Sequence, residues 1–292
     1  MKNLWLFIPI ALLAIATTAF SNANVGMTLD RETTVDSLGA CQGISYQSGR
    51  IFLYSDREIG MIREFKLQND SLTYLHKEYK LTLKGVDVIS HPTGIAYNGG
   101  GQVFIGNSVK LNPEGTQWKA VIYKVNWNGL LKTRTLDGNL INTIDDDACI
   151  QGTRPEYVKY NNKWYVATAD YGYHGNEVRL YDPEMLGKCK KTSEAGVLFK
   201  KFTCSPWVQN LHWIAGKGVL VLIQNQVEGR KWRFTYVDFA KSVEAGKMQV
   251  IKQIDIDNRA DELEGFTFLN TQKGVAVTSS RKSNVNYTKT SW

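Results

Sequence analysis

The chain has 292 residues, 43% of them hydrophobic, and a formal net charge of +7 with a pI of about 9.1. This composition is enough for one large domain or two small ones. The positive charge weakly favours acidic partners. The basic residues are dispersed and form no Lys/Arg block, so they give little support to a nucleic-acid partner.

The first 23 residues have the pattern of a secretory signal peptide. Lys2 supplies a positive start, an apolar run covers residues 4–16, and Ser21 and Ala23 provide small residues for a cleavage site. The run is short for a membrane span, although an uncleaved anchor is the alternative. We therefore expect a single exported domain over residues 24–292, secreted or periplasmic, monomeric and without stable membrane insertion after cleavage.

Export makes the even number of cysteines informative. Cys41, Cys149, Cys189 and Cys204 are widely spaced and include no C-x-x-C pair, which disfavours a structural zinc site or a thioredoxin-type motif. In an oxidising compartment two disulfides are expected. Three connectivities are open, and the short loop favours Cys189–Cys204.

Five segments along the chain repeat one pattern of strand, turn and second, more apolar strand. Their separations of 51, 63, 54 and 54 residues are nearly constant, and such spacing is typical of a repeat architecture. The anchor positions of the five repeats are Gly43, Gly94, Tyr157, Leu211 and Gly265.

Each of the first four repeats continues with an alternating third strand and a more polar fourth one. The expected third strands are "MIREFKL", "AVIYKVN", "EVRLYD" and "KWRFTYV"; the expected fourth strands are "LTYLHKEYKLTL", "LLKTRTL", "GVLFKKF" and "QVIKQIDI". Four strands in about 54 residues predict an all-β, five-bladed β-propeller. A six-bladed ring is the alternative, if residues 108–150 contain an irregular blade.

The last repeat lacks a fourth strand, and the segment before the first repeat, "MTLDRETTV", has no other partner. We therefore expect the N-terminal strand to close the ring as the outer strand of the last blade. Such closure removes exposed strand edges.

The residue before each anchor is expected at the mouth of the central channel. All five of these residues carry a side-chain oxygen: Gln42, Thr93, Glu156, Asn210 and Glu264. Mixed amide, hydroxyl and carboxylate oxygens suit a hard cation, so the ring predicts a calcium site. A solvated ring without a ligand is the alternative, since polar residues before strands are ordinary turn chemistry.

A second polar set ends the second strand of each repeat: Asp56, Asn107, Asp170, Asn225 and Ser279. These residues are expected beside the first set, either orienting the ligands as a second shell or capping turns. His91 and His212 are the candidate catalytic bases, although a packed or surface role is the simpler interpretation of each. His76 is expected to be structural, and His174 lies in a polar hairpin.

The arrangement resembles the senescence-marker/gluconolactonase and paraoxonase group of six-bladed propellers. The gluconolactonase motifs "EGP", "RPND" and "NGL" are similar to Gln42-Gly43-Ile44, to residues 154–157 and to residues 210–212, with substitutions at each. The segment "LEGFTF" also resembles the "EGI" motif of the five-bladed calcium-activated apyrases. These resemblances imply a calcium ion on the propeller axis and a hydrolytic activity.

We therefore expect a calcium-dependent hydrolase acting on a small-molecule or anionic ester, lactone or phosphoanhydride, with the cation polarising the reacting oxygen. The alternative is a non-enzymatic propeller that binds a ligand or glycan and holds a structural cation. The aromatic residues Trp118, Trp127, Trp207 and Trp232 would permit sugar stacking.

Overall fold

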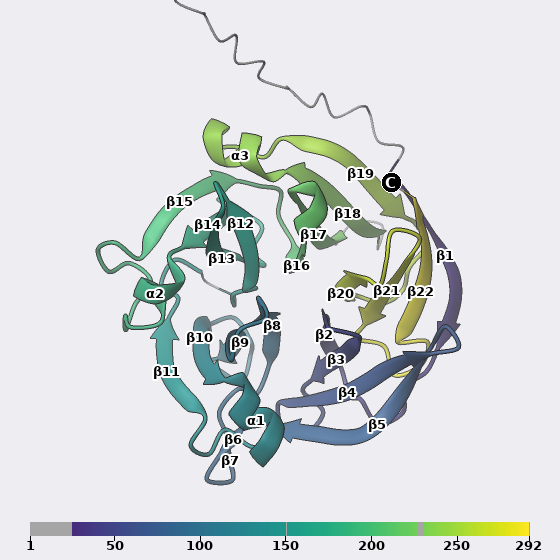
Figure 1. Ribbon diagram of the computed structural model, residues 1–292, viewed down its shortest axis with the longest axis horizontal. Coiled ribbons are helices and arrows are strands. Elements are labelled where there is room, and N and C mark those ends of the chain that lie inside the picture. The colour runs from purple at the N-terminus through teal and green to yellow at the C-terminus, as the bar shows by residue number, and fades with distance from the viewer. Residues whose placement is uncertain (1–24, 150, 227–230, 292) are drawn as a thin grey trace, which may run out of the picture.

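The computed structural model describes residues 25–149, 151–226 and 231–291. Five four-stranded antiparallel sheets are arranged in a ring, which confirms a five-bladed β-propeller (Figure 1). The expected signal peptide lies outside the described residues and stays a prediction. Within the described part, no helix has the length and apolar character that a membrane crossing would need.

The blades follow one another along the chain. Blade 1 contains β2 (Cys41–Gln47), β3 (Arg50–Ser55), β4 (Met61–Gln68) and β5 (Ser71–Lys80). A small hairpin, β6 (Thr82–Leu83) and β7 (Val86–Asp87), leads to blade 2. Blade 2 contains β8 (Pro92–Ala96), β9 (Gln102–Lys110), β10 (Trp118–Asn126) and β11 (Leu140–Asp145). Because residues 108–149 complete blade 2 and enter blade 3, they contain no sixth blade.

The remaining blades repeat this order. Blade 3 contains β12 (Glu156–Tyr160), β13 (Lys163–Ala169), β14 (Glu177–Tyr181) and β15 (Leu198–Thr203). Blade 4 contains β16 (Val208–Ile214), β17 (Val219–Gln226), β18 (Lys231–Asp238) and β19 (Val250–Ile256). Blade 5 contains β20 (Leu263–Phe268), β21 (Lys273–Thr278), β22 (Val285–Ser291) and, as its outer strand, β1 (Gly26–Thr33). A short 3-10 helix, η1 (Ala215–Lys217), joins β16 to β17.

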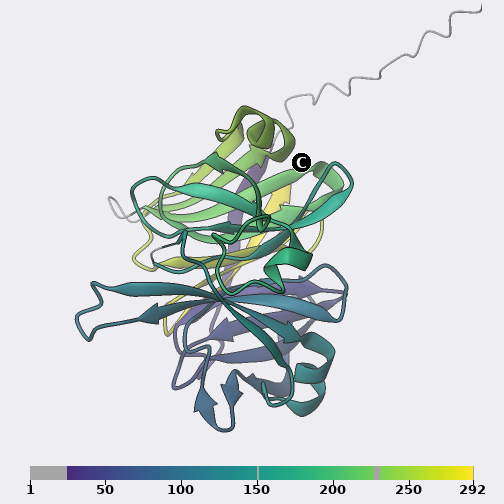
Figure 2. The same ribbon diagram turned by 90° about the vertical axis from the view of Figure 1, so that its left-hand side faces the viewer.

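The N-terminal strand closes the ring as expected. β1 pairs antiparallel with β22 from Gly26 opposite Ser291 to Thr33 opposite Val285. In Figure 1 the purple β1 lies along the outside of the yellow strands of blade 5. Seen from the side, the purple and blue strands of blades 1 and 2 lie across the ring from the green strands of blade 4 (Figure 2).

Three short helices join the third and fourth strands of blades 2 to 4: α1 (Trp127–Thr133), α2 (Pro183–Leu186) and α3 (Phe239–Ala245). The expectation that "LLKTRTL" is the outer strand of blade 2 is wrong, because α1 covers most of it. Asn126 caps the start of α1 by accepting from the Gly129 N–H, and Trp127 and Leu130 turn into the core. The outer strand follows instead as β11.

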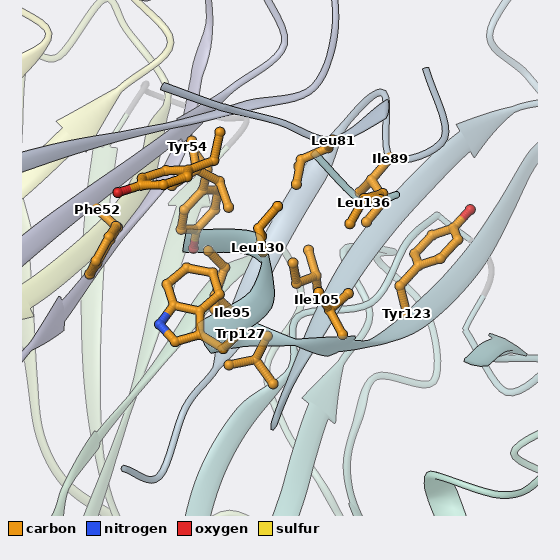
Figure 3. Close-up of a cluster of buried hydrophobic side chains, with 14 of the residues drawn as sticks. Phe52, Tyr54, Leu81, Ile89, Ile95, Ile105, Tyr123, Trp127, Leu130 and Leu136 are labelled. Carbon is orange, nitrogen blue, oxygen red and sulfur yellow. The ribbon is translucent and has the colours of Figure 1, made fainter. Parts of the chain in front are cut away.

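The core is divided into five apolar clusters, each lying between two neighbouring blades. The cluster between blades 1 and 2 includes Phe52, Tyr54 and Ile105, and is covered by Trp127 and Leu130 from α1 (Figure 3). Phe52 meets the Trp127 ring edge-on at 5.2 Å. Because each sheet packs on both faces, its middle strands are apolar on both sides, as the sequence of the second strands indicated.

The described cysteines form no disulfide, so the expectation of two disulfides, and of Cys189–Cys204 in particular, is wrong. Cys189 belongs to the cluster between blades 2 and 3, whereas Cys204 packs against the cluster between blades 3 and 4. The sheet of blade 3 therefore lies between these two thiols. A short loop in sequence does not bring its ends together when they pack on opposite faces of one sheet.

Tyr54 reaches across the central channel. Its phenol oxygen accepts a hydrogen bond of 2.7 Å from Asn210 Nδ2, which comes from blade 4, and Tyr54 is only 1% exposed. The ring passes over Gly43 on the neighbouring strand, where an added Cβ would overlap it. The Tyr54 ring thus occupies the space that a side chain at the first anchor, Gly43, would fill.

Replacing Gly43 with alanine is therefore expected to destabilise the fold by about 1–3 kcal/mol, since the Tyr54 ring must move and the backbone at φ +155 resists a side chain. The measurement is urea unfolding followed by tryptophan fluorescence. Gly216→Ala is the matched control, because nothing lies within 4 Å of a Cβ there. Equal midpoints for the two variants would contradict this packing.

Candidate functional site

Four of the five inner strands contain a bulge at the same point. The strand register shifts across Gln42 in β2, Thr93 in β8, Gln209 in β16 and Glu264 in β20. Bulges redirect a side chain and are common beside functional sites. In blade 3 no shift occurs, and Pro155 packs against Gly94 of the neighbouring strand. Arg154, the residue before Pro155, is therefore the blade 3 member of this set.

This geometry revises two of the five expected ring positions. Gln42, Thr93 and Glu264 lie at bulges, whereas in blades 3 and 4 the corresponding residues are Arg154 and Gln209, and not Glu156 and Asn210. The prediction from the sequence counts residues back from each hairpin turn. This count fails in blade 3 because β12 has no bulge, and in blade 4 because the bulge lies at Gln209, one residue before Asn210. A guanidinium thus takes the place of one of the two expected carboxylates.

Two cavities occupy the channel, one on each side of the contact between Tyr54 and Asn210, and they share no lining residue. We name the first the His91 cavity. Its volume is about 410 Å³, and its polar lining residues include Gln42, His91, Arg154, Gln209, Glu262 and Glu264. The second, the Glu156 cavity, has a volume of about 310 Å³ and is lined by Glu156, Asn210, His212 and Tyr54, among others.

In the His91 cavity a carboxylate holds the imidazole. His91 Nδ1 lies 2.8 Å from Asp56 Oδ2, and the same oxygen accepts a 3.4 Å hydrogen bond from Gln42 Nε2. The backbone N–H of His91 donates to Asn107 Oδ1 at 2.9 Å. Asn107 of blade 2 therefore fixes the backbone of His91, and Asp56 of blade 1 fixes its imidazole ring.

Arg154 is the buried cation of this cavity, at 4% exposure. Its guanidinium donates to the backbone carbonyl oxygen of Gln209 at 3.3 Å, to Gln209 Oε1 at 3.1 Å and to the Gln151 carbonyl at 3.4 Å. It also lies over the Tyr171 ring at 5.4 Å. Burial lowers the pKa of Arg154, while the charges of Asp170 and Glu264 oppose that change.

Glu264 is the buried acid, at 3% exposure. Burial raises the pKa of the Glu264 carboxyl group well above its ordinary value, the neighbouring Glu262 raises it further, and Arg154 opposes both. The carboxyl group therefore holds its proton to a higher pH than an exposed glutamate does. Such a group is a candidate general acid.

The remaining residues of the second polar set have structural partners. Asp170 Oδ1 accepts from the Gln151 N–H at 3.2 Å, and Asn225 Oδ1 accepts from the Leu263 N–H at 2.7 Å. Ser279 lines the His91 cavity and donates its N–H to the Glu262 carbonyl oxygen at 3.2 Å. Of this set, Asp56 is the member that contacts two predicted site residues directly.

The two candidate bases lie in different cavities. His212 lines the Glu156 cavity, where burial lowers its pKa to about 4 and its Nε2 accepts from the Phe268 N–H at 3.4 Å. In the same cavity burial raises the pKa of Glu156 to about 8, against hydrogen bonds from the backbone N–H groups of Tyr157 and Trp213. His212 and His91 therefore cannot serve one reaction centre.

The five expected calcium donors do not fit one ion. Gln42 and Glu264 line the His91 cavity, Glu156 and Asn210 line the other one, and the Thr93 hydroxyl donates to the Thr153 carbonyl. Over the described part of the chain, no group of three or more His, Cys, Asp or Glu residues is placed to hold a metal ion. Calcium binding remains a prediction from the residue types.

Several residues of these two cavities were not identified from the sequence. Glu262, two residues before Glu264, also lines the His91 cavity. Tyr54 lies two residues before Asp56 in the same repeat, opposite a glycine whose missing side chain was the available signal. Of the four tryptophans proposed for stacking, Trp127 and Trp232 are buried, while Trp118 and Trp207 are half-buried.

No protein-family model matches the chain, and no curated protein matches its sequence. Among solved structures it is similar to a glutaminyl cyclase from Myxococcus xanthus, with a TM-score of 0.55 and 12% identity over 91% of this chain and 96% of that one. It is also similar to a GH43 endo-arabinanase from Bacillus licheniformis, with a TM-score of 0.48 and 10% identity over 89% and 96%.

A third similar structure is a putative 6-phosphogluconolactonase from Bacteroides fragilis, with a TM-score of 0.38 and 13% identity over 81% of this chain and 63% of that one. These neighbours are β-propellers, and they carry names of enzymes. At such identities the likeness supports the fold alone. The likeness to the gluconolactonase, paraoxonase and apyrase groups stays at the level of the propeller fold.

Proposed function

We propose that the chain is an enzyme that hydrolyses an ester or lactone in the His91 cavity. The observation that carries the proposal is the 2.8 Å contact between His91 Nδ1 and the Asp56 carboxylate, in a cavity that also contains buried Arg154 and Glu264. A base held by a carboxylate, an acid with a raised pKa and a fixed cation can together supply the proton transfers and the oxyanion stabilisation of acyl transfer to water.

The roles follow from the contacts. When Nδ1–H is donated to Asp56, His91 Nε2 can take a proton from a water molecule, whose oxygen then attacks the ester carbonyl carbon. Three N–H donors of Arg154 are used by Gln209 and Gln151, which leaves two of its five for the developing oxyanion. Glu264 gives its proton to the leaving oxygen as the C–O bond breaks, and the products are an acid and an alcohol.

The charge of the cavity favours an ester or lactone over a phosphoanhydride. Its acidic groups are Glu262, Glu264 and the Asp56 carboxylate beside His91, whereas Arg154 is its buried guanidinium. The protonated Glu264 carboxyl group adds no charge of its own. A polyphosphate would add several negative charges next to the Glu262 and Asp56 carboxylates, and like charges at short range repel. A substrate with at most one negative charge avoids this cost.

The mechanism contains no step through calcium, because the predicted donors do not meet in one cavity. A calcium requirement, which the oxygen-bearing residues of the sequence predict, stays open to test. Purified protein is assayed after EDTA treatment and again with added calcium. If EDTA abolishes activity and calcium restores it, the enzyme requires calcium. If activity is equal under all conditions, the side chains of the His91 cavity catalyse the reaction without calcium.

Hydrolysis is tested with a panel of aryl esters and lactones, and a peptide with an N-terminal glutamine is added because a structural neighbour is a glutaminyl cyclase. For the best substrate, His91→Ala is expected to lower kcat by about 10²- to 10⁴-fold, since the general base is lost. His174→Ala is the control, because that exposed histidine packs on Tyr173 outside the cavity. Unchanged kcat in His91→Ala would refute the role.

A second candidate is a propeller that binds a ligand without turning it over. The observation that favours it is an aromatic pair at the rim, where Tyr173, 58% exposed, stacks on Trp207 at 5.5 Å with an interplanar angle of 16°. Tyr171 joins this pair to the cavity through its edge-on contact with Trp207. Saturable quenching of tryptophan fluorescence by a panel member that is never hydrolysed would favour binding alone.

A further inference from the structure

The Glu156 cavity is a second site, separate from the proposed reaction centre. Residues from all five blades line it, including Tyr97 from the loop after β8, Trp164 from β13 and Thr267 from β20. The hydrogen-bonded side chains of Tyr54 and Asn210 close the inner end of this cavity, toward the centre of the channel. It therefore opens on the face of the ring opposite the His91 cavity.

Glu156 is the one acidic residue among the described residues that line this cavity, and none of those residues is a lysine or arginine. Its Oε1 accepts from the Tyr157 N–H at 2.8 Å, and the Trp213 N–H is its other backbone partner. A carboxylate offers about four acceptor positions. Two backbone donors orient the group and leave acceptor capacity for a ligand.

The walls around this carboxyl group are aromatic. Tyr46, Tyr97, Trp164 and Trp213 all line the cavity, and Tyr46 keeps 40% exposure at its mouth. Aromatic faces attract organic cations, an effect that strengthens when water is excluded. The structure already contains one such contact at a ring of this wall, where Lys159 Nζ lies 5.9 Å from the Trp164 ring centre.

We propose that the Glu156 cavity binds a small organic cation, an amine or quaternary ammonium group, whose charge pairs with Glu156 while its carbon atoms contact the aromatic walls. A half-buried carboxyl group with no cationic side chain lining its cavity, and aromatic rings around it, are the two features that such a ligand needs. A bare metal ion would leave the aromatic walls unused. The site goes beyond the proposed hydrolysis and does not depend on it.

Binding must depend on pH, because the cation requires the ionised form of Glu156. The other titratable groups that line the cavity are Tyr46, Tyr54, Tyr97, Tyr157 and His212. Burial keeps His212 neutral by lowering its pKa to about 4, and burial raises the pKa values of Tyr54 and Tyr157. Glu156 is therefore the group expected to change charge between pH 6 and 9.

The probe is tetramethylammonium chloride, whose charge does not vary with pH, titrated at constant ionic strength with tryptophan fluorescence as the readout. We expect saturable quenching at pH 9 and an apparent Kd at least about tenfold weaker at pH 6, because burial raises the pKa of Glu156 and protonation removes its charge. n-Butylammonium should bind and n-butanol should not. Absence of saturable binding, or equal binding of n-butanol, would overturn the proposal.

Variants separate this site from the proposed reaction centre. Glu156→Gln should weaken tetramethylammonium binding at pH 9 at least about tenfold, and Tyr97→Leu should weaken it about threefold to tenfold. Glu264→Gln, in the other cavity, should bind normally. Undiminished affinity in folded Glu156→Gln refutes the site. Loss of hydrolysis with retained ammonium binding bears on the His91 cavity alone.

Discussion

In the Glu264→Gln variant, kcat for the best ester substrate is expected to fall by about 10²- to 10⁴-fold, with KM changed only a few-fold. Glutamine keeps the size of the side chain but has no acidic proton for the leaving oxygen. The loss should be smaller for esters with good leaving groups, which need little protonation. Steady-state kinetics with a series of aryl esters of graded leaving-group pKa measures both effects.

Glu262→Gln is the matched control for this variant. Glu262 lines the same cavity but is exposed, and it acts on Glu264 through its charge. Removing that charge should lower the pKa of Glu264 and shift the alkaline limb of the kcat profile to lower pH, with the maximum rate nearly kept. If the two variants lose activity equally at every pH, Glu264 is not the acid.

A second large effect is expected in the pH dependence of stability. Burial raises the pKa of Glu156 to about 8 from an ordinary value of 4.5. The folded state therefore binds this proton more tightly than the unfolded state. Its contribution to stability is complete below about pH 4.5 and is lost as pH rises through 8.

The Glu156→Gln variant removes this titration. Because Glu156 is half-buried and reaches solvent through its cavity, we expect part of the full difference, about 1–3 kcal/mol. Relative to the unmodified protein, the variant should gain this amount in free energy of unfolding between pH 5 and pH 8.5, measured with urea. Asp30→Asn, at an exposed surface position, is the control, and a pH-independent difference for Glu156→Gln would contradict the burial of its carboxyl group.

The fold could be predicted from the sequence because propeller blades repeat. Apolar second strands and regular spacing predict the propeller, and the unpaired N-terminal strand predicts the closure of blade 5 by β1. The spacing alone left a sixth blade in residues 108–150 as an alternative. The outer strand of blade 2 could not be predicted, since residues 130–136 mix apolar and polar side chains as a strand can. Residues 130–133 instead belong to α1, where Trp127 and Leu130 pack into the core.

The candidate site was harder to predict because it depends on single-residue register. A bulge shifts every side chain after it to the other face. The sequence shows Arg154, Pro155 and Glu156 in a row without showing which one faces the His91 cavity. The division of the channel was equally inaccessible, because Tyr54 and Asn210 come from blades that are not neighbours.

The pairing of β1 with β22 also sets the order in which the molecule can be completed. Gly26 lies opposite Ser291, so the last blade is closed by pairing between the two ends of the described chain. Chains rich in such contacts fold slowly, because loop-closure entropy is lost before the contacts form. Until β22 has been synthesised, the edge of β1 has no partner within its sheet. A chaperone or a second nascent chain would meet that edge first, and domain-swapped dimers through β1 are the expected product of refolding at high protein concentration.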